Sequence, residues 1–207
     1  TGVQTCALPI CKTRGEIMCD GVDLLREACG DKWILGCGVP LGTCMGIFDA
    51  CRISCDANKD WSFKLSNGLS QTALLGLVRV NQESPSSQNA IINTVFRNHL
   101  DGRAFCNDPD VFFLRDFNLG YTWEQKLLHG KVNTICGNVL FVSDNAGDFD
   151  DERIGYLKDF FRDKDYKVRL AEYEDEDVIR LDFTENGEDK SLKFNLKTGE
   201  SNVFEVL

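Results

Sequence analysis

The stretch CRISCD at residues 51–56 carries the residue types with the clearest chemical potential. It ends an apolar run that begins at Ile47, and such a run predicts a β-strand. Because side chains alternate along a strand, Arg52, Ser54 and Asp56 share one side. A carboxyl group beside a guanidinium can form a structural salt bridge, or it can donate a proton while the cation holds a substrate hydroxyl. Cleavage of a glycosidic bond needs an acid of the second kind.

The ten cysteines could form disulfides, bind a metal ion or stay reduced. No C-x-x-C pair occurs, and only His99 and His129 could add imidazole ligands, so the spacing argues against a zinc site. Cys37 and Cys55 lie in apolar runs, which predicts buried thiols. The chain has no N-x-[ST] acceptor and no signal-like opening segment, so we expect reduced thiols and a cytoplasmic location, with disulfides as the alternative.

The composition is that of an ordinary globular protein. Of 207 residues, 43% are hydrophobic and 27% are charged, which excludes disorder as the dominant state. The formal net charge of −10 provides no cationic surface for nucleic-acid phosphates. No run of about 18 apolar residues occurs, so the chain is not expected to cross a membrane. We therefore expect neither a nucleic-acid nor a membrane partner.

The opening residues TGVQTCALPI look like the in-frame translation of a sequencing adapter. We therefore assign residues 1–11 to an expected artefact and exclude them from the fold prediction. The natural protein is then expected to begin upstream, so this chain would be a fragment.

Apolar strand-like runs and helical patterns alternate between residues 12 and 163. Strands are predicted at 33–39, 47–56, 103–106 and 138–143, and helices at 15–29, 89–100, 122–136 and 150–161. The pair Thr122 and Gln125 has the spacing of a capping box, and Gly30 is suited to end the first helix. Strand–helix alternation predicts parallel strands with crossover helices. With polar residues gathered beyond the strand ends, this α/β pattern predicts strands five to eight of a (β/α)8 TIM barrel.

From residue 164 the hydrophobic period changes to two. Alternation at 166–170, 178–183 and 192–196, followed by 203–207, predicts a small antiparallel β domain of about four strands at residues 164–207. Asn186 and Gly187 suit a tight turn. The acidic run at 172–177 is expected to be a solvated loop rather than a calcium site.

Five motifs, in order, resemble the second half of the catalytic barrel of α-galactosidases of glycoside hydrolase families 27 and 36. The resemblance covers residues 12–161, and the last domain resembles the β domain that follows the barrel in these enzymes. The motifs are ILGCGVPLG at 34–42, CRISCDANKDW at 51–61, HLDGRAFCNDPDVFFLR at 99–115, LGYTWEQ at 119–125 and LFVSDN at 140–145.

The resemblance implies roles for five residues. Asp56 falls on the general acid/base of the family, and Arg52, four residues before it, on the ligand of the substrate hydroxyls. Cys37 and Asp110 fall on positions at the sugar site, and Gly38 stands where animal-type members place a sugar-contacting glutamate.

Other residues near these motifs have simpler expected roles. Asp108 and Asn107 are expected to brace the loop at NDPD, while Asp60 and Trp61 are expected to cap and pack. Gly42 stands where animal-type members have a tyrosine that contacts the sugar. The resemblance therefore supports the fold more strongly than it supports the identity of the sugar.

The family nucleophile, an aspartate in a Lys-x-Asp context on strand four, has no counterpart in this chain. The resemblance therefore implies a fragment of a retaining α-galactosidase-like enzyme that cleaves terminal α-galactosides without metal or organic cofactor. The resemblance is compatible with an oligomeric parent. The fragment alone is expected to be inactive, poorly expressed and prone to self-association through its open strand edges.

Three alternatives remain at this point. The first is a non-catalytic carbohydrate-binding relative. The second is a related exo-glycosidase or transglycosylase, of the α-N-acetylgalactosaminidase, β-L-arabinopyranosidase or raffinose synthase kind. The third is a thiol- or zinc-based regulatory protein, which only the number of cysteines suggests.

Overall fold

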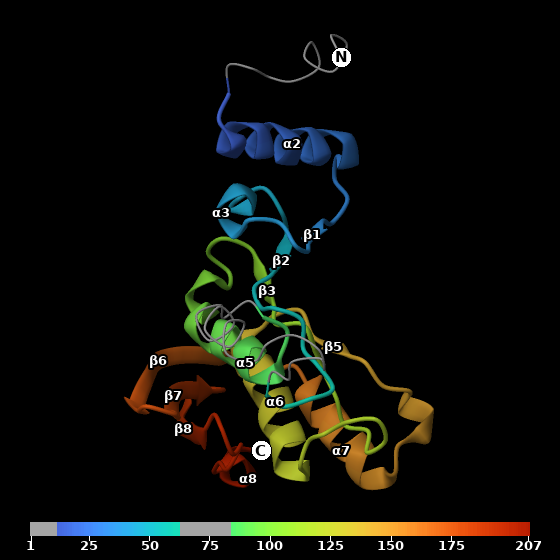
Figure 1. Cartoon of the computed structure of the whole chain (residues 1–207), viewed down its shortest axis with the longest axis vertical. Coiled ribbons are helices and arrows are strands. Elements are labelled where there is room, and N and C mark those ends of the chain that lie inside the picture. The colour runs from blue at the N-terminus through green and yellow to red at the C-terminus, as the bar shows by residue number, and fades with distance from the viewer. Residues whose placement is uncertain (1–11, 63–83) are drawn as a thin grey trace, which may run out of the picture.

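A computed structural model describes residues 12–62 and 84–207, so the expected adapter segment lies outside the described residues. Helix α2, Arg14–Cys29, lies at one end of the molecule and the C-terminal sheet at the other (Figure 1). The first sheet has the order β1-β2-β3, a second pairs β4 with β5, and all of these strands are parallel, as the alternation predicted. Their bounds are β1 Leu35–Gly36, β2 Ala50–Arg52, β3 Cys106–Asp108, β4 Val111–Phe112 and β5 Phe141–Val142.

One extended segment, residues 106–112, joins the two parallel sheets. Its first part, β3, pairs with β2, and its second part, β4, pairs with β5. The break between them falls at Pro109 and at Asp110, which has a φ of 72°. Counted with β3 and β4 as one interrupted strand, the parallel strands occur along the chain in the predicted order.

The predicted strands are longer than the observed ones, and the third is displaced. The prediction placed it at 103–106, whereas β3 begins at Cys106 and continues into NDPD. Arg103 and Ala104 instead form a turn, with both N–H groups directed to the Leu100 carbonyl at 3.1 and 2.9 Å. The ladder begins only where the Cys106 N–H reaches the Asp49 carbonyl at 2.8 Å.

The helices agree closely with the sequence patterns. Thr122 caps α6, where its hydroxyl accepts the Gln125 N–H at 3.2 Å and completes the predicted capping box. Gly30 follows α2 with a φ of 57°. The helix predicted at 89–100 ends at Phe96 and is followed by the 3-10 turn η1. The bounds are α2 Arg14–Cys29, α3 Leu41–Cys44, α5 Ser87–Phe96, η1 Asn98–Leu100, α6 Trp123–Cys136, η2 Ala146–Asp148 and α7 Asp151–Phe160.

The C-terminal region forms a three-stranded antiparallel sheet in the order β6-β7-β8. These strands are β6 Tyr166–Asp175, β7 Val178–Glu185 and β8 Glu188–Asn195. The turn at Asn186 and Gly187 is confirmed, with positive φ values of 52° and 89°. Two predictions here are wrong: Val203–Val206 is the short helix α8 rather than a fourth strand, and the acidic run belongs largely to β6 rather than to a loop.

The acidic run can form a strand because β6 is an edge strand with one face in solvent. Glu172 pairs with Arg180 and Tyr173 with Ile179 in the ladder, so the backbone is satisfied while the acidic side chains stay hydrated.

The largest hydrophobic core is shared by α5, α6, α7 and the C-terminal sheet. Its fully buried members include Ile91, Leu128, Phe160 and Leu181. A smaller cluster, with Val22 of α2, Cys44, Phe48 and Ile53 among its members, lies under α2 and α3. In the described residues, no helix is both long and apolar enough to span a membrane.

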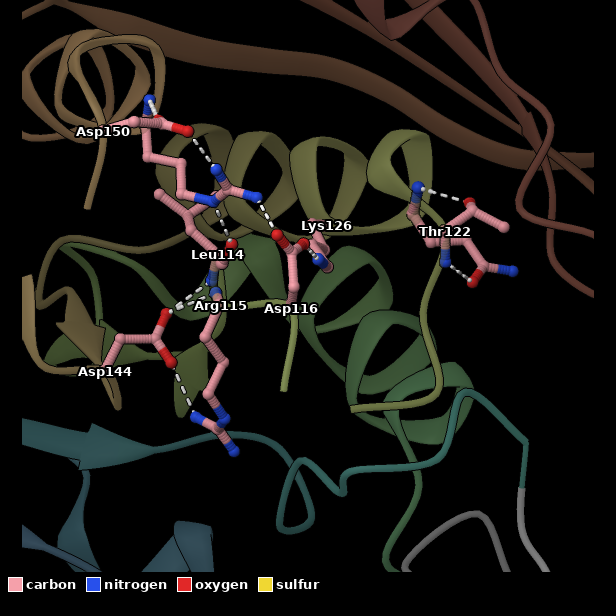
Figure 2. A network of polar contacts seen from close by, with 9 residues as sticks. Leu114, Arg115, Asp116, Thr122, Lys126, Asp144 and Asp150 are labelled. Carbon is pink, nitrogen blue, oxygen red and sulfur yellow. Dashed lines mark hydrogen bonds and ion pairs between the residues drawn. The ribbon is translucent and has the colours of Figure 1, made fainter. Parts of the chain in front are cut away.

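A polar network joins the ends of β4 and β5 to helix α7 (Figure 2). The buried Asp144 carboxylate accepts the Arg115 backbone N–H at 3.1 Å and pairs with the Arg115 guanidinium at 2.6 Å. Arg153 of α7 donates to the Leu114 carbonyl at 3.1 Å and also pairs with Asp116. These contacts fix the loop that follows β4.

Candidate functional site

Arg52 is the last residue of β2, and it lies opposite Asp108, the last residue of β3. Its guanidinium reaches three carboxylates. The Nη1 atom lies 2.8 Å from Oδ1 of Asp56, and Nη2 lies 2.9 Å from Oδ1 of Asp110. The Nε atom lies 3.7 Å from Oδ2 of Asp108. The carboxyl ends of two neighbouring parallel strands thus place one cation among three acids, and the predicted contact between Arg52 and Asp56 is present.

Asp110 is held on both its backbone and its side chain. Its N–H donates to Oδ1 of Asp108 at 2.8 Å, and its Oδ2 accepts the Ala57 N–H at 2.7 Å. Its carbonyl accepts from Nδ2 of Asn133 at 3.1 Å. These contacts keep the side chain on Arg52 although the left-handed φ of 72° is disfavoured for a residue other than glycine.

The three acids differ in their surroundings. Asp108 is fully buried, and burial raises the pKa of its carboxyl; the Asp110 N–H and Arg52 offset this only in part. Burial would lower the pKa of Arg52, but Asp110, Cys37 and Asp108 outweigh it, so that pKa is raised and the guanidinium stays charged. Asp56 differs from both acids near it, because its side chain is 70% exposed.

A cavity of about 430 Å³ opens beside Arg52. Gly38 borders it with a φ of 69°, and a Cβ atom added there would meet nothing within 4 Å. Ser54 also lines it, while its hydroxyl donates to the Pro109 carbonyl at 2.7 Å. The structure therefore brings together Gly38, Arg52 and Ser54, all of which the sequence analysis singled out.

Arg97, which follows α5, also lines this cavity and was not predicted. Its guanidinium donates to the Ile53 carbonyl, just beyond β2. An arginine inside the helix predicted at 89–100 carries no signal of such a position, because the contact depends on how the end of α5 packs in the tertiary structure.

Cys37 is exposed, which corrects the prediction that its thiol is buried. The reason is that β1 ends at Gly36, so residue 37 lies beyond the sheet. Cys55 is buried, as predicted, and its thiol lies 3.8 Å from the Ser86 carbonyl. Burial raises the pKa of the Cys51 thiol to about 12, so this residue behaves as a neutral core side chain.

The remaining residues near the motifs have structural roles. The Asn107 amide donates to the Arg97 carbonyl at 3.2 Å and to the Cys136 carbonyl at 3.3 Å, which braces the NDPD segment. Trp61 is buried in the main core, and Asp60 forms a β-bridge with Gly120. The contacts of Asn107 and the burial of Trp61 agree with the bracing and packing roles that the sequence suggested.

Within residues 12–62 and 84–207, no group of three or more His, Cys, Asp or Glu side chains is placed to hold a metal ion. The arrangement offers instead a charged hydrogen-bond donor, Arg52, and a buried acceptor, Asp110, beside an exposed carboxyl group, Asp56. Such a set can bind sugar hydroxyls and exchange a proton with an adjacent oxygen.

The fold is that of α-galactosidases, as comparison with solved structures shows; no family model matches the sequence. The α-galactosidase TtGalA from Thermus thermophilus, solved with p-nitrophenyl α-D-galactopyranoside, matches 83% of the chain with a TM-score of 0.63 at 24% identity. The same enzyme with stachyose matches 70% with a TM-score of 0.58, also at 24% identity. α-Galactosidase I from Mortierella vinacea matches 89% with a TM-score of 0.59 at 11% identity.

The chain spans only part of these enzymes. It covers 32% and 29% of the two Thermus chains and 49% of the Mortierella chain. The resemblance inferred from the motifs is thus confirmed at the level of the fold.

Proposed function

We propose that this chain is part of a retaining α-galactosidase-like glycoside hydrolase that acts on terminal α-galactosides. Residues 12–163 would supply strands five to eight of a (β/α)8 barrel, and residues 164–207 the β domain that follows. The observation that carries the proposal is the Arg52 guanidinium, which contacts both Asp56 and Asp110 at the carboxyl ends of neighbouring parallel strands. Active sites of such barrels lie at this edge.

In this reaction Asp56 is the general acid and then the general base. Its carboxyl group gives a proton to the glycosidic oxygen as the bond from that oxygen to the anomeric carbon breaks. A nucleophilic carboxylate, which this chain does not supply, forms the bond to the anomeric carbon. The Asp56 carboxylate next takes a proton from water, whose oxygen displaces the nucleophile.

The other residues hold the sugar. Arg52 can donate hydrogen bonds to sugar hydroxyls, and Asp110 can accept them. Cys37 and Gly38 follow β1, and Gly38 borders the cavity, where open space beside it can take a ring substituent. No metal ion or organic cofactor has a role in this scheme.

The activity of this chain alone depends on the second carboxyl group. Retaining hydrolysis needs two carboxyl groups that face the anomeric carbon from opposite sides. Asp56, whose side chain is 70% exposed, would supply only the acid of this pair. We therefore expect no glycosidase turnover from the 207-residue chain.

The test uses the reading frame cloned together with the DNA upstream of it. We expect activity on p-nitrophenyl α-galactoside, and a loss of about 10²–10⁴-fold in kcat for raffinose-type substrates in Asp56→Ala. With p-nitrophenyl α-galactoside, whose leaving group needs no protonation, azide should restore turnover of this variant and give a glycosyl azide, because the small anion displaces the nucleophile without a general base. The matched control is Asp151→Ala, at an exposed position in the first turn of α7, which should keep wild-type activity.

Several results would overturn the proposal. Inactivity on all α-galactosides would remove the substrate assignment, and preferential cleavage of an α-N-acetylgalactosaminide or β-L-arabinopyranoside would replace it with a related enzyme. An upstream sequence without a Lys-x-Asp strand would instead favour a non-catalytic carbohydrate-binding protein.

A further inference from the structure

Asp108 is a buried acid whose two carboxylate oxygens have different surroundings. The side chain is fully buried. Its Oδ1 accepts the Asp110 N–H at 2.8 Å, whereas its Oδ2 has no hydrogen-bond partner in the described part of the chain. Nε of Arg52 is also buried without a hydrogen-bond partner there, and it lies 3.7 Å from that oxygen. Burial of charged groups without hydrogen-bond partners costs free energy, which only a favourable interaction between the charges offsets.

The bonded oxygen constrains Asp110. A carboxylate that accepts the N–H two residues ahead forms a local turn, and aspartate favours this geometry. Here the turn coincides with the left-handed φ of Asp110. The Asp108 backbone is itself fixed, because its carbonyl accepts the Ile53 N–H at 2.9 Å next to β2. The Asp110 side chain is therefore aimed at Arg52 from a rigid base.

The second oxygen of Asp108 also faces Arg52. Asp56 and Asp110 contact the Nη1 and Nη2 atoms of Arg52, and the negative charge of Asp108 lies near Nε. A planar guanidinium with an acid beside each of its three nitrogens has little freedom to rotate.

We propose that Asp108 is a positioning residue, which holds both Arg52 and Asp110 in the orientation that binds substrate hydroxyls. One oxygen fixes the Asp110 backbone, and the charge on the other orients Arg52 through Nε. The binding of sugar by this pair rests on the proposed function, whereas the orientation of Arg52 by Asp108 does not.

The first experiment follows the Nε–Hε resonance of Arg52 by NMR in the 15N-labelled chain. Asp108→Asn keeps an oxygen that can accept the Asp110 N–H but removes the charge, so we expect a changed chemical shift and faster hydrogen exchange at Arg52 Nε. The matched control is Asp101→Asn, because Asp101 also accepts a backbone N–H, from Asn107 at 2.7 Å, without contacting Arg52. The control should leave the Arg52 resonance unchanged.

A pH titration of the wild-type chain tests the same contact without the variant, so it can be used even if Asp108→Asn does not fold. Arg52 Nε–Hε and the Asp108 carboxyl carbon should shift together as Asp108 takes up a proton. The other groups that face Arg52, namely Asp56, Asp110 and Cys37, are followed in the same spectra to separate their effects. The proposal is overturned if the Arg52 Nε–Hε resonance does not shift as Asp108 takes up a proton. It is also overturned if this resonance is unchanged in folded Asp108→Asn.

The second experiment separates this proposal from the proposed function, with D-galactose as the probe. In the protein expressed with its upstream sequence, Asp108→Asn should weaken galactose binding by about 10-fold and raise KM more than it lowers kcat, while Asp101→Asn stays within about twofold. If Arg52 responds to Asp108 but the wild type binds no galactose, the proposed function fails and the positioning of Arg52 stands. If galactose binds equally well to wild type and Asp108→Asn, the positioning proposal fails.

Discussion

The indole N–H of Trp61 donates to the carbonyl of Leu196 at 2.9 Å, across 135 residues of sequence. Trp61 lies five residues after Asp56, and Leu196 follows the last strand of the C-terminal sheet. The same carbonyl accepts a second bond, from Nε2 of Gln88 at 2.8 Å. The segment that carries the proposed acid is therefore tied directly to the C-terminal sheet.

Replacement of Trp61 tests this connection. Trp61→Phe keeps an aromatic ring but loses the hydrogen bond and part of the packing, so we expect a loss of about 1–2 kcal/mol in the free energy of unfolding. The loss is moderate because Leu196 keeps its bond from Gln88. Urea denaturation measures it, and Trp33→Phe, at a tryptophan that is 57% exposed, should change stability by less than about 0.5 kcal/mol.

His129 of α6 predicts a pH dependence of stability. Its ring is fully buried, neither nitrogen has a hydrogen-bond partner in the described residues, and burial lowers its pKa from 6.5 to about 4. The unfolded chain therefore binds a proton on this ring below about pH 6.5, whereas the folded chain does not. Stability falls as the pH decreases, and between pH 7 and 5 this residue alone accounts for about 2 kcal/mol.

The comparison of variants isolates that contribution, because carboxyl groups also titrate at low pH. His129→Leu should show a smaller loss of stability between pH 7 and 5 than the wild type does. The exposed His99 is the chain's other histidine, and His99→Leu should follow the wild-type curve. Equal pH dependence of wild type and His129→Leu would contradict the expectation.

Two helical glycines should respond in opposite directions to the same substitution. A Cβ atom on Gly130 of α6 would lie 2.5 Å from the ring of Phe160 in α7, so Gly130→Ala should destabilise by about 1–3 kcal/mol despite better helix propensity. A Cβ atom on Gly21 of α2 meets nothing within 4 Å, so Gly21→Ala should stabilise by up to about 1 kcal/mol. Thermal or urea unfolding measures both, and a stable Gly130→Ala would show that α6 and α7 are not so closely packed.

Helix α2 carries an uncovered apolar stripe, which predicts self-association. Leu24 and Leu25 are 65% and 53% exposed, and Ile17 and Met18 lie two turns earlier on the same side. Val22 is the one buried residue of this helix. Sedimentation velocity should show concentration-dependent association that the double variant Leu24→Glu/Leu25→Glu reduces. Phe204→Glu, at an exposed position of α8, should leave it unchanged, and association indifferent to the α2 variant would contradict the interpretation.

Local signals in the sequence predicted the helices well. The Thr122–Gln125 capping box and the positive φ of Gly30 involve contacts within a few residues, so residue types alone specify them. The strands were predicted in the right order but with poor bounds, because a strand extends only as far as a neighbour pairs with it. Residues 203–206 were assigned to the wrong type of element, since an apolar pattern this short does not distinguish a strand from a helix.

The sequence by itself determined the order of parallel strands and helices, and the spacing that lets Arg52 reach Asp56. Both follow from local periodicity and from polar residues placed at strand ends. Only the tertiary structure decided that Asp108 and Asp110 share the same guanidinium, that Cys37 is exposed and that Arg97 reaches the cavity. These features depend on the register of β2 against β3 and on the packing of α5, which are set by contacts between residues far apart in the chain.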